Sequence, residues 1–119
     1  MTWDHPDFGE RSFAFACDIV RVYQAISKIR DFPPGIARQL LDAGTSIGAN
    51  LAESPGSSSR RDLTSRFSIA LREARETKFW LRLIRATDLA PDKITKRIAA
   101  EADELVAILT VSVRNLKGS

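Results

Sequence analysis

The sequence predicts an all-α fold, an antiparallel up-and-down four-helix bundle that forms a single domain over residues 1–119. Four segments repeat apolar residues at spacings of three and four, as helices with one buried face do. Three short breaks, each containing proline, separate these segments, and no strand pattern occurs. Because short breaks between long helices make consecutive helices antiparallel neighbours, an up-and-down connectivity follows.

The breaks set the expected helix boundaries. They lie at residues 31–35, 54–59 and 88–91. Proline lacks the amide donor and disfavours a helical conformation at the residue before it, so each helix should end before its break. The helices are therefore expected at about residues 11–30, 34–53, 60–89 and 91–116.

Several local signals support these helices. Ser59 is a suitable N-cap for the third helix, and Asp62 three residues later resembles a capping box. Pro91 suits the first position of the fourth helix. Gly44 and Gly48 lower the intrinsic propensity of the second helix. Their four-residue spacing would also let another helix approach closely.

The composition is that of an ordinary globular domain. Hydrophobic residues make up 44% of the chain and charged residues 28%, so one core can form without disulfides or metal. The single cysteine, Cys17, cannot form an internal disulfide, which fits a reducing cytoplasm. Residues 1–10 lack the pattern of a signal peptide, and no apolar run approaches the length of a membrane span. We therefore expect a cytoplasmic protein without a membrane partner.

The positive charge is concentrated on one segment. The net charge is +3, from 18 basic and 15 acidic side chains. Residues 60–89 contain eight basic and four acidic residues, a net of +4, whereas the rest of the chain sums to −1. The third helix is therefore the place to look for an anionic partner.

At about 100° per residue, the side chains of the third helix fall into three sectors. The first is the expected core stripe: Leu63, Phe67, Ala70, Ala74, Thr77, Leu81 and Ile84. The second is basic: Arg72, Arg75, Lys78, Arg82 and Arg85, extended at the helix start by Arg60 and Arg61. The third mixes apolar and acidic residues: Ile69, Glu73, Glu76, Trp80 and Leu83.

Two interpretations of the basic sector are open. It is either a solvated face with local ion pairs, Arg72 with Glu76 and Arg85 with Asp88, or a strip that binds phosphates. The third sector is also ambiguous. A bundle helix needs only one apolar stripe, so Trp80 belongs either to a wide core or to an oligomer interface.

The sequence lacks the combinations of residues that are typical of a catalytic site. His5 is the only histidine, so a di-iron site of the Glu-x-x-His type is unsupported. Glu73 and Glu76 are one turn apart, but arginines alternate with them and favour ion pairing over metal binding. Cys17 has no basic activator nearby in the sequence, and no glycine-rich phosphate loop occurs. We expect no enzymatic activity, no cofactor and no bound metal.

Between residues 46 and 83 the sequence resembles the four helix bundle protein family. This family is also called the S23 ribosomal proteins, after a protein encoded within intervening sequences of bacterial 23S rRNA genes. The matching residues are 46–53 (SIGANLAE), 59–63 (SRRDL), 69–77 (IALREARET) and 80–83 (WLRL). The resemblance implies an antiparallel four-helix bundle that assembles as a homopentamer. It also implies RNA, DNA or a protein as a partner, because one member binds nucleic acid and a reverse transcriptase.

Some positions depart from the family pattern. Leu41 and Asp42 stand where many relatives have two basic residues, so the second helix lacks that support for nucleic-acid binding. Gly48 replaces a common proline, and Ser54 a common glycine.

Two hypotheses of function follow. The chain is either a nucleic-acid-binding module that uses the basic sector, or an oligomeric scaffold whose arginines form ion pairs between subunits. In both, Ile69, Trp80 and Leu83 lie in the subunit interface. The polar residues of the family motif are Asn50, Glu53, Glu73 and Glu76. We expect Asn50 and Glu53 to make buried or interfacial contacts with Arg72, Arg75 or the neighbours of Glu76.

Overall fold

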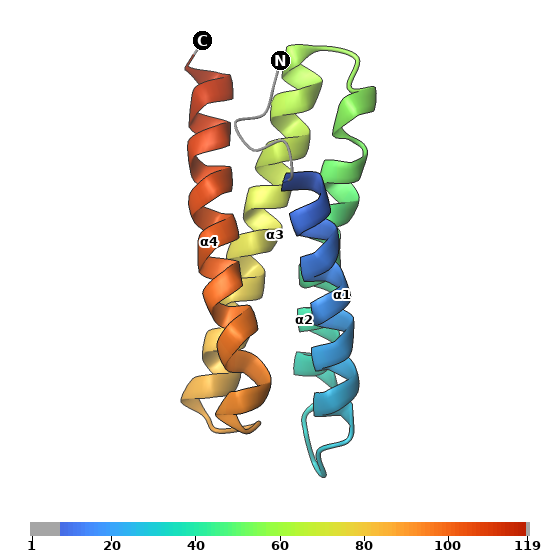
Figure 1. The fold of residues 1–119 in the computed structure, drawn as a ribbon, viewed down its shortest axis with the longest axis vertical. Coiled ribbons are helices and arrows are strands. Elements are labelled where there is room, and N and C mark those ends of the chain that lie inside the picture. The colour runs from blue at the N-terminus through green and yellow to red at the C-terminus, as the bar shows by residue number, and fades with distance from the viewer. Residues whose placement is uncertain (1–7, 119) are drawn as a thin grey trace.

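The computed structural model describes residues 8–118, which form four long helices and one short one. These are α1 (Phe8–Ser27), α2 (Pro34–Ala52), η1 (Ser54–Gly56), α3 (Arg60–Ala86) and α4 (Asp92–Lys117). The long helices run alternately up and down along a molecule of 48 × 22 × 21 Å (Figure 1). No strand occurs in the described part of the chain. The predicted helical bundle is confirmed.

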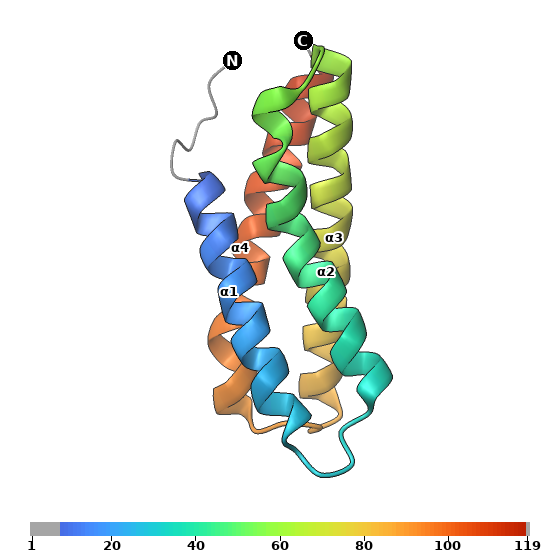
Figure 2. The ribbon, with the colours of Figure 1, turned by 90° about the vertical axis from the view of Figure 1, so that its right-hand side faces the viewer.

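Each long helix packs against the next one in the chain, and α4 returns to contact α1 less extensively. Helices α1 and α3 make no contact, so they are diagonal to each other. Figure 2 shows the four helices side by side, with the α1–α2 and α3–α4 turns at the same end.

The core is built from one apolar row on each helix. Its largest fully buried side chains include Phe15, Ile47, Phe67, Leu81 and Leu105. In α3, six of the seven residues of the predicted core stripe are buried, and Leu63 in the second turn is half-buried. This result fixes the rotational position of α3, because a helix that buries these residues must turn its remaining sectors outward.

Three predicted boundaries were off by a few residues. Helix α1 begins and ends three residues earlier than expected, and Asp31 adopts a left-handed φ of 62° in the turn that follows. Helix α3 ends at Ala86 instead of residue 89, because Asp88 takes a left-handed φ of 55° and reverses the chain. Pro91 is the N-cap of α4 and not its first helical residue.

The start of α3 is capped nearly as predicted. The Ser59 side chain accepts a hydrogen bond of 3.0 Å from the Asp62 amide. The Asp62 carboxylate in turn accepts the Ser58 amide at 3.0 Å, one residue before the position that a capping box uses. That hydrogen bond is the main reason why the pKa of Asp62 is lowered from its ordinary value.

The two glycines of α2 allow the close approach that their spacing suggests. A Cβ atom at Gly44 would lie 2.5 Å from Cγ1 of Ile19, a fully buried residue of α1. At Gly48 a Cβ atom would lie 3.1 Å from the Ser12 carbonyl oxygen. At Gly44 the missing side chain makes room for Ile19 of α1, and at Gly48 the two helix backbones themselves come close.

Gly44→Ala should destabilise the protein by roughly 1–3 kcal/mol, because the added methyl group overpacks the site against Ile19. This loss should appear although alanine has the higher helix propensity. Gly35→Ala is the matched control, since it lies in the same helix and a Cβ there meets nothing within 4 Å. Urea unfolding of both variants measures the difference. Equal stability of the two variants would contradict the close contact.

Leu81→Ala should lower the free energy of unfolding by roughly 2–5 kcal/mol, because it leaves a cavity at a core position that is 1% exposed. Val111→Ala on α4, at a position 41% exposed, serves as the control and should change stability by less than about 0.5 kcal/mol. Denaturant melts test both. A similarly small effect at Leu81 would mean that the rotational position of α3 is wrong.

Candidate nucleic-acid interface

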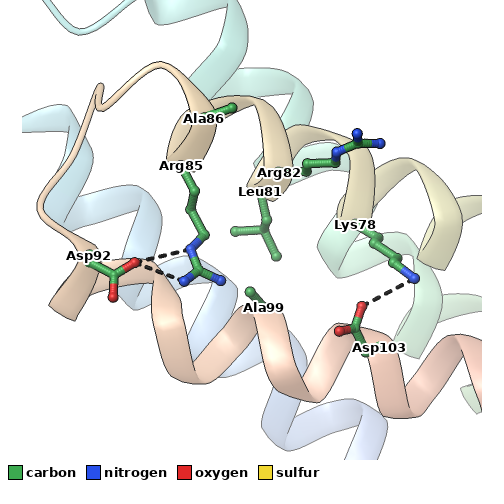
Figure 3. Close-up of a pocket in the computed structure, with 8 residues that line it drawn as sticks. All are labelled: Lys78, Leu81, Arg82, Arg85, Ala86, Asp92, Ala99 and Asp103. Carbon is green, nitrogen blue, oxygen red and sulfur yellow. Dashed lines mark hydrogen bonds and ion pairs between the residues drawn. The ribbon is translucent and has the colours of Figure 1, made fainter.

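Part of the basic sector of α3 lines the outer groove between α3 and α4, with Arg82 near one end and Arg60 at the other, whereas Arg72 and Arg75 lie outside the lining. At one end of this groove is a cavity of about 480 Å³. Figure 3 shows it, with Leu81 and Ala99 facing each other at its centre and charged side chains at either side. It is lined by Lys78, Leu81, Arg82, Arg85, Ala86, Asp92, Ala99 and Asp103.

Two cations of this cavity are paired with carboxylates of α4. Lys78 Nζ lies 3.2 Å from Asp103 Oδ1. Arg85 donates to Asp92 Oδ1 from Nε at 3.1 Å and from Nη2 at 2.8 Å (Figure 3). The predicted partner of Arg85, Asp88, was wrong, because the start of α4 brings Asp92 beside the guanidinium.

Three other arginines of the sector are exposed and uncommitted. Within the described residues, Arg72, Arg75 and Arg82 have no carboxylate within 4.0 Å. The predicted pair of Arg72 with Glu76 does not form; Glu76 Oε2 instead accepts the indole N–H of Trp80 at 3.1 Å. These three guanidinium groups are free to meet an external anion.

The far end of the α3–α4 groove carries no carboxylate among the residues that line it. This hollow of about 580 Å³ is lined by Arg60, Arg61, Thr64, Ser65, Ser68, Leu116 and Lys117. Arg60 Nε donates to the Leu116 carbonyl oxygen at 3.2 Å, which ties the side chain to the end of α4. The sequence did not single out Lys117, because its position beside Arg60 depends on how α4 aligns with α3.

The third sector of α3 faces outward beside α2. Ile69, Trp80 and Leu83 are each half-buried. Trp80 packs against the core. The chain therefore covers this apolar sector only in part, and the indole belongs partly to a wide core.

The polar residues of the motif have other partners than those expected. Asn50 Nδ2 donates to the Ser46 carbonyl oxygen at 2.8 Å, within α2. Glu53 Oε1 accepts from Arg66 Nη1 at 2.9 Å, across the α2–α3 junction. The expected contacts of Asn50 and Glu53 with Arg72 or Arg75 were wrong, because Arg66 lies closer to the end of α2 than either arginine.

Glu73 is the carboxylate of this face that lacks a cation. Within the described residues no ion pair reaches it, and it is half-buried. Partial desolvation raises its pKa above the ordinary glutamate value, and the nearby charges of Glu76 and Asp42 raise it further. Arg72 partly opposes the rise. The face beside α2 is thus acidic where the face beside α4 is basic.

Phe79 belongs to none of the three sectors predicted for α3. Its side chain is 54% exposed and lies on the outward side of α3, next to Trp80 in an edge-to-face contact with ring centroids 5.0 Å apart. The signal was present, since an aromatic residue on a helix surface between Arg75 and Arg82 is unusual.

Among residues 8–118, no group of three or more histidine, cysteine, aspartate or glutamate side chains is arranged to hold a metal ion. Cys17 is a free thiol and half-buried, whereas His5 lies outside the described residues. In the same part of the chain, no helix is both long and apolar enough to cross a membrane.

Comparisons with known proteins agree with this architecture. The family model of the 23S rRNA-intervening sequence protein matches residues 7–111. A solved structure from Bacteroides thetaiotaomicron, described as a protein of unknown function from the S23 ribosomal protein family, is similar with a TM-score of 0.81 and 31% identity. The match covers 89% of this chain and 94% of that one. No curated protein matches the chain significantly in sequence.

Glu73→Gln should raise the melting temperature near pH 7. Because the pKa of Glu73 is raised in the folded state, the folded protein binds this proton more tightly than the unfolded chain does. The free energy of unfolding therefore falls as the pH rises from the ordinary glutamate pKa through the raised one. Glutamine carries no charge, so the variant does not lose this stability. Its advantage over wild type should shrink as the pH is lowered toward about 4, where Glu73 itself becomes protonated. Thermal melts across this range test it. A variant less stable than wild type at pH 7 would show that the carboxylate has a favourable partner.

Proposed function

The chain belongs to the 23S rRNA-intervening sequence protein family, and from this premise we propose that it is a non-catalytic, homo-oligomeric nucleic-acid-binding protein that contacts phosphates through α3. Cations line the groove between α3 and α4 at both of its ends, and the exposed Arg72 and Arg75 lie between these ends on α3. Cations in such a row match the repeating charge of a nucleic-acid backbone.

The observation that supports this proposal most is the set of cations without carboxylate partners. Lys78 and Arg85 are paired with carboxylates of α4, so less of their charge is available to an external anion. The remaining residues of the predicted strip keep their charge available for phosphates: Arg60, Arg61, Arg72, Arg75 and Arg82. Lys117 adds a further cation at the end that carries no acid.

Oligomerisation is the second part of the proposal. Ile69, Trp80 and Leu83 remain half-exposed in the single chain, and contact with a neighbouring subunit would cover them. A closed ring covers such a sector on every subunit without leaving open ends. The resemblance of the sequence implies a pentamer. Repetition of the strip around a ring would strengthen binding by avidity.

One observation favours the alternative of a scaffold without nucleic acid. Within the described residues Glu73 forms no ion pair, and Arg72, Arg75 and Arg82 have no carboxylate within 4.0 Å. If a neighbouring subunit brought these groups together, the arginines would serve assembly instead of binding phosphate.

The double substitution Arg75→Glu with Arg82→Glu separates the two functions. If the arginines face solvent, nucleic-acid affinity should fall at least about tenfold, and the slope of log K against log salt should decrease by roughly two, one for each lost phosphate contact. The oligomer should persist in sedimentation velocity. Gel shifts with generic RNA and DNA at low salt measure the affinity.

The control is Arg21→Glu with Lys28→Glu. It changes the net charge equally but lies on α1, which makes no contact with α3. Dissociation of the Arg75/Arg82 variant would support the scaffold and reject phosphate binding by these side chains. A monomeric wild type that shifts neither RNA nor DNA would reject both functions.

A further inference from the structure

Phe79 is an exposed aromatic ring among uncommitted arginines. Four large hydrophobic side chains in the described chain are markedly exposed: Phe13, Val20, Phe79 and Val111. Of these, Phe79 alone has arginines one turn away on both sides, Arg75 four residues before it and Arg82 three residues after it. Phe13 has Gly9, Glu10, Ala16 and Cys17 at the corresponding positions.

The spacing places the ring within the row of free cations. Arg72, Arg75 and Arg82 lie within seven residues of Phe79, which is about 10 Å along a helix. None of the three has a carboxylate within 4.0 Å in the described structure. A polyanion held by these guanidinium groups would therefore pass directly over or beside the ring.

The ring is also supported from one side. Trp80 meets it edge to face, with an interplanar angle of 77°. The indole is itself held by its hydrogen bond to Glu76 and by packing on the core. Support of this kind restricts the ring's motion and leaves more than half of its surface open.

We propose that Phe79 is a stacking platform for an unpaired base, and that the ligand of the α3 strip is a single-stranded nucleic acid. This inference rests on the proposed function. Stacking on an aromatic face requires a base that is free of its own stack, whereas a duplex offers only its backbone and groove edges to a helix surface. An aromatic ring flanked by cations is the combination that single-strand binding proteins use.

The apolar alternative is an interface with a second copy of the chain. The residues around Phe79 argue against it as the main occupant, because three unpaired arginines would then have to be desolvated with it. The apolar sector Ile69, Trp80 and Leu83 lies toward the other side of α3 and carries the carboxylates instead. The two surfaces therefore differ in the partner that they fit.

Phe79→Ala tests the proposal by fluorescence polarisation with a single-stranded oligonucleotide of about 10 nucleotides, within the range of known single-strand site sizes. Affinity for the single strand should fall about 5- to 100-fold, the scale of losing one stacked base, while binding to a duplex of the same length should change by less than about twofold. Phe79→Trp should retain single-strand binding. Phe13→Ala, which removes a ring on α1 that is even more exposed than Phe79, should leave both affinities unchanged.

The other outcomes are distinguishable. If Phe79→Ala binds the single strand like wild type while Arg75→Glu with Arg82→Glu does not bind, stacking is wrong and the proposed function stands. An equal loss for single strand and duplex would also reject stacking. Dissociation of Phe79→Ala in sedimentation velocity would assign the ring to a subunit interface. Failure of the wild type to bind either ligand would reject the proposed function and this inference together.

Discussion

Burial of one apolar row fixes the rotation of α3, and this rotation determines which side chains of α3 face α4, α2 or the outside. Angles around the helix can be measured from Leu81 at about 100° per residue. Toward α4, Arg85 and Lys78 lie only about 40° and 60° away, and both reach carboxylates of α4. Arg82 and Arg75 lie at about 100° and 120° and reach none. Lys78 and Arg85 thus lie close enough to the core row to reach α4, whereas Arg82 and Arg75 lie too far around the helix to do so.

The fold could be predicted because its signals are local. The rows that face the core repeat within each helix, and the prolines that separate the helices are visible residue by residue. The signals that determine where the helices end are less local. Asp31 and Asp88 terminate their turns in left-handed conformations, which a non-glycine residue adopts only when the path to the next helix requires it. These ends were accordingly the least accurate part of the prediction.

The sequence could predict which residues form the basic strip, but not which of them pair with carboxylates. Which cations are neutralised depends on the axial register of α4 against α3, and that register brings Asp103 to Lys78 across 25 residues of chain. No spacing rule within one helix gives such a pair. The same limit explains why Glu53 was assigned to the wrong arginines and why Lys117 was overlooked. The exposure of Phe79, by contrast, could have been derived, since it lies about 160° from Leu81 on the helix that carries both.

The two proposed roles of α3 use opposite flanks of one helix. On the side away from α4, Glu73, Trp80 and Ile69 lie at about 80°, 100° and 120° from Leu81, the mirror image of the arginines. A subunit docked on that flank would leave Arg75 and Arg82 open, so assembly and phosphate binding do not compete there. A neighbouring subunit and a phosphate could compete only on the side of α3 farthest from the core. There Arg72 lies at about 180° from Leu81, and Leu83 lies at about 160° on the side away from Phe79. A chain of net charge +3 has little long-range attraction for nucleic acid. Under the proposed function, affinity would therefore come from cations concentrated on one flank and repeated by assembly on the other.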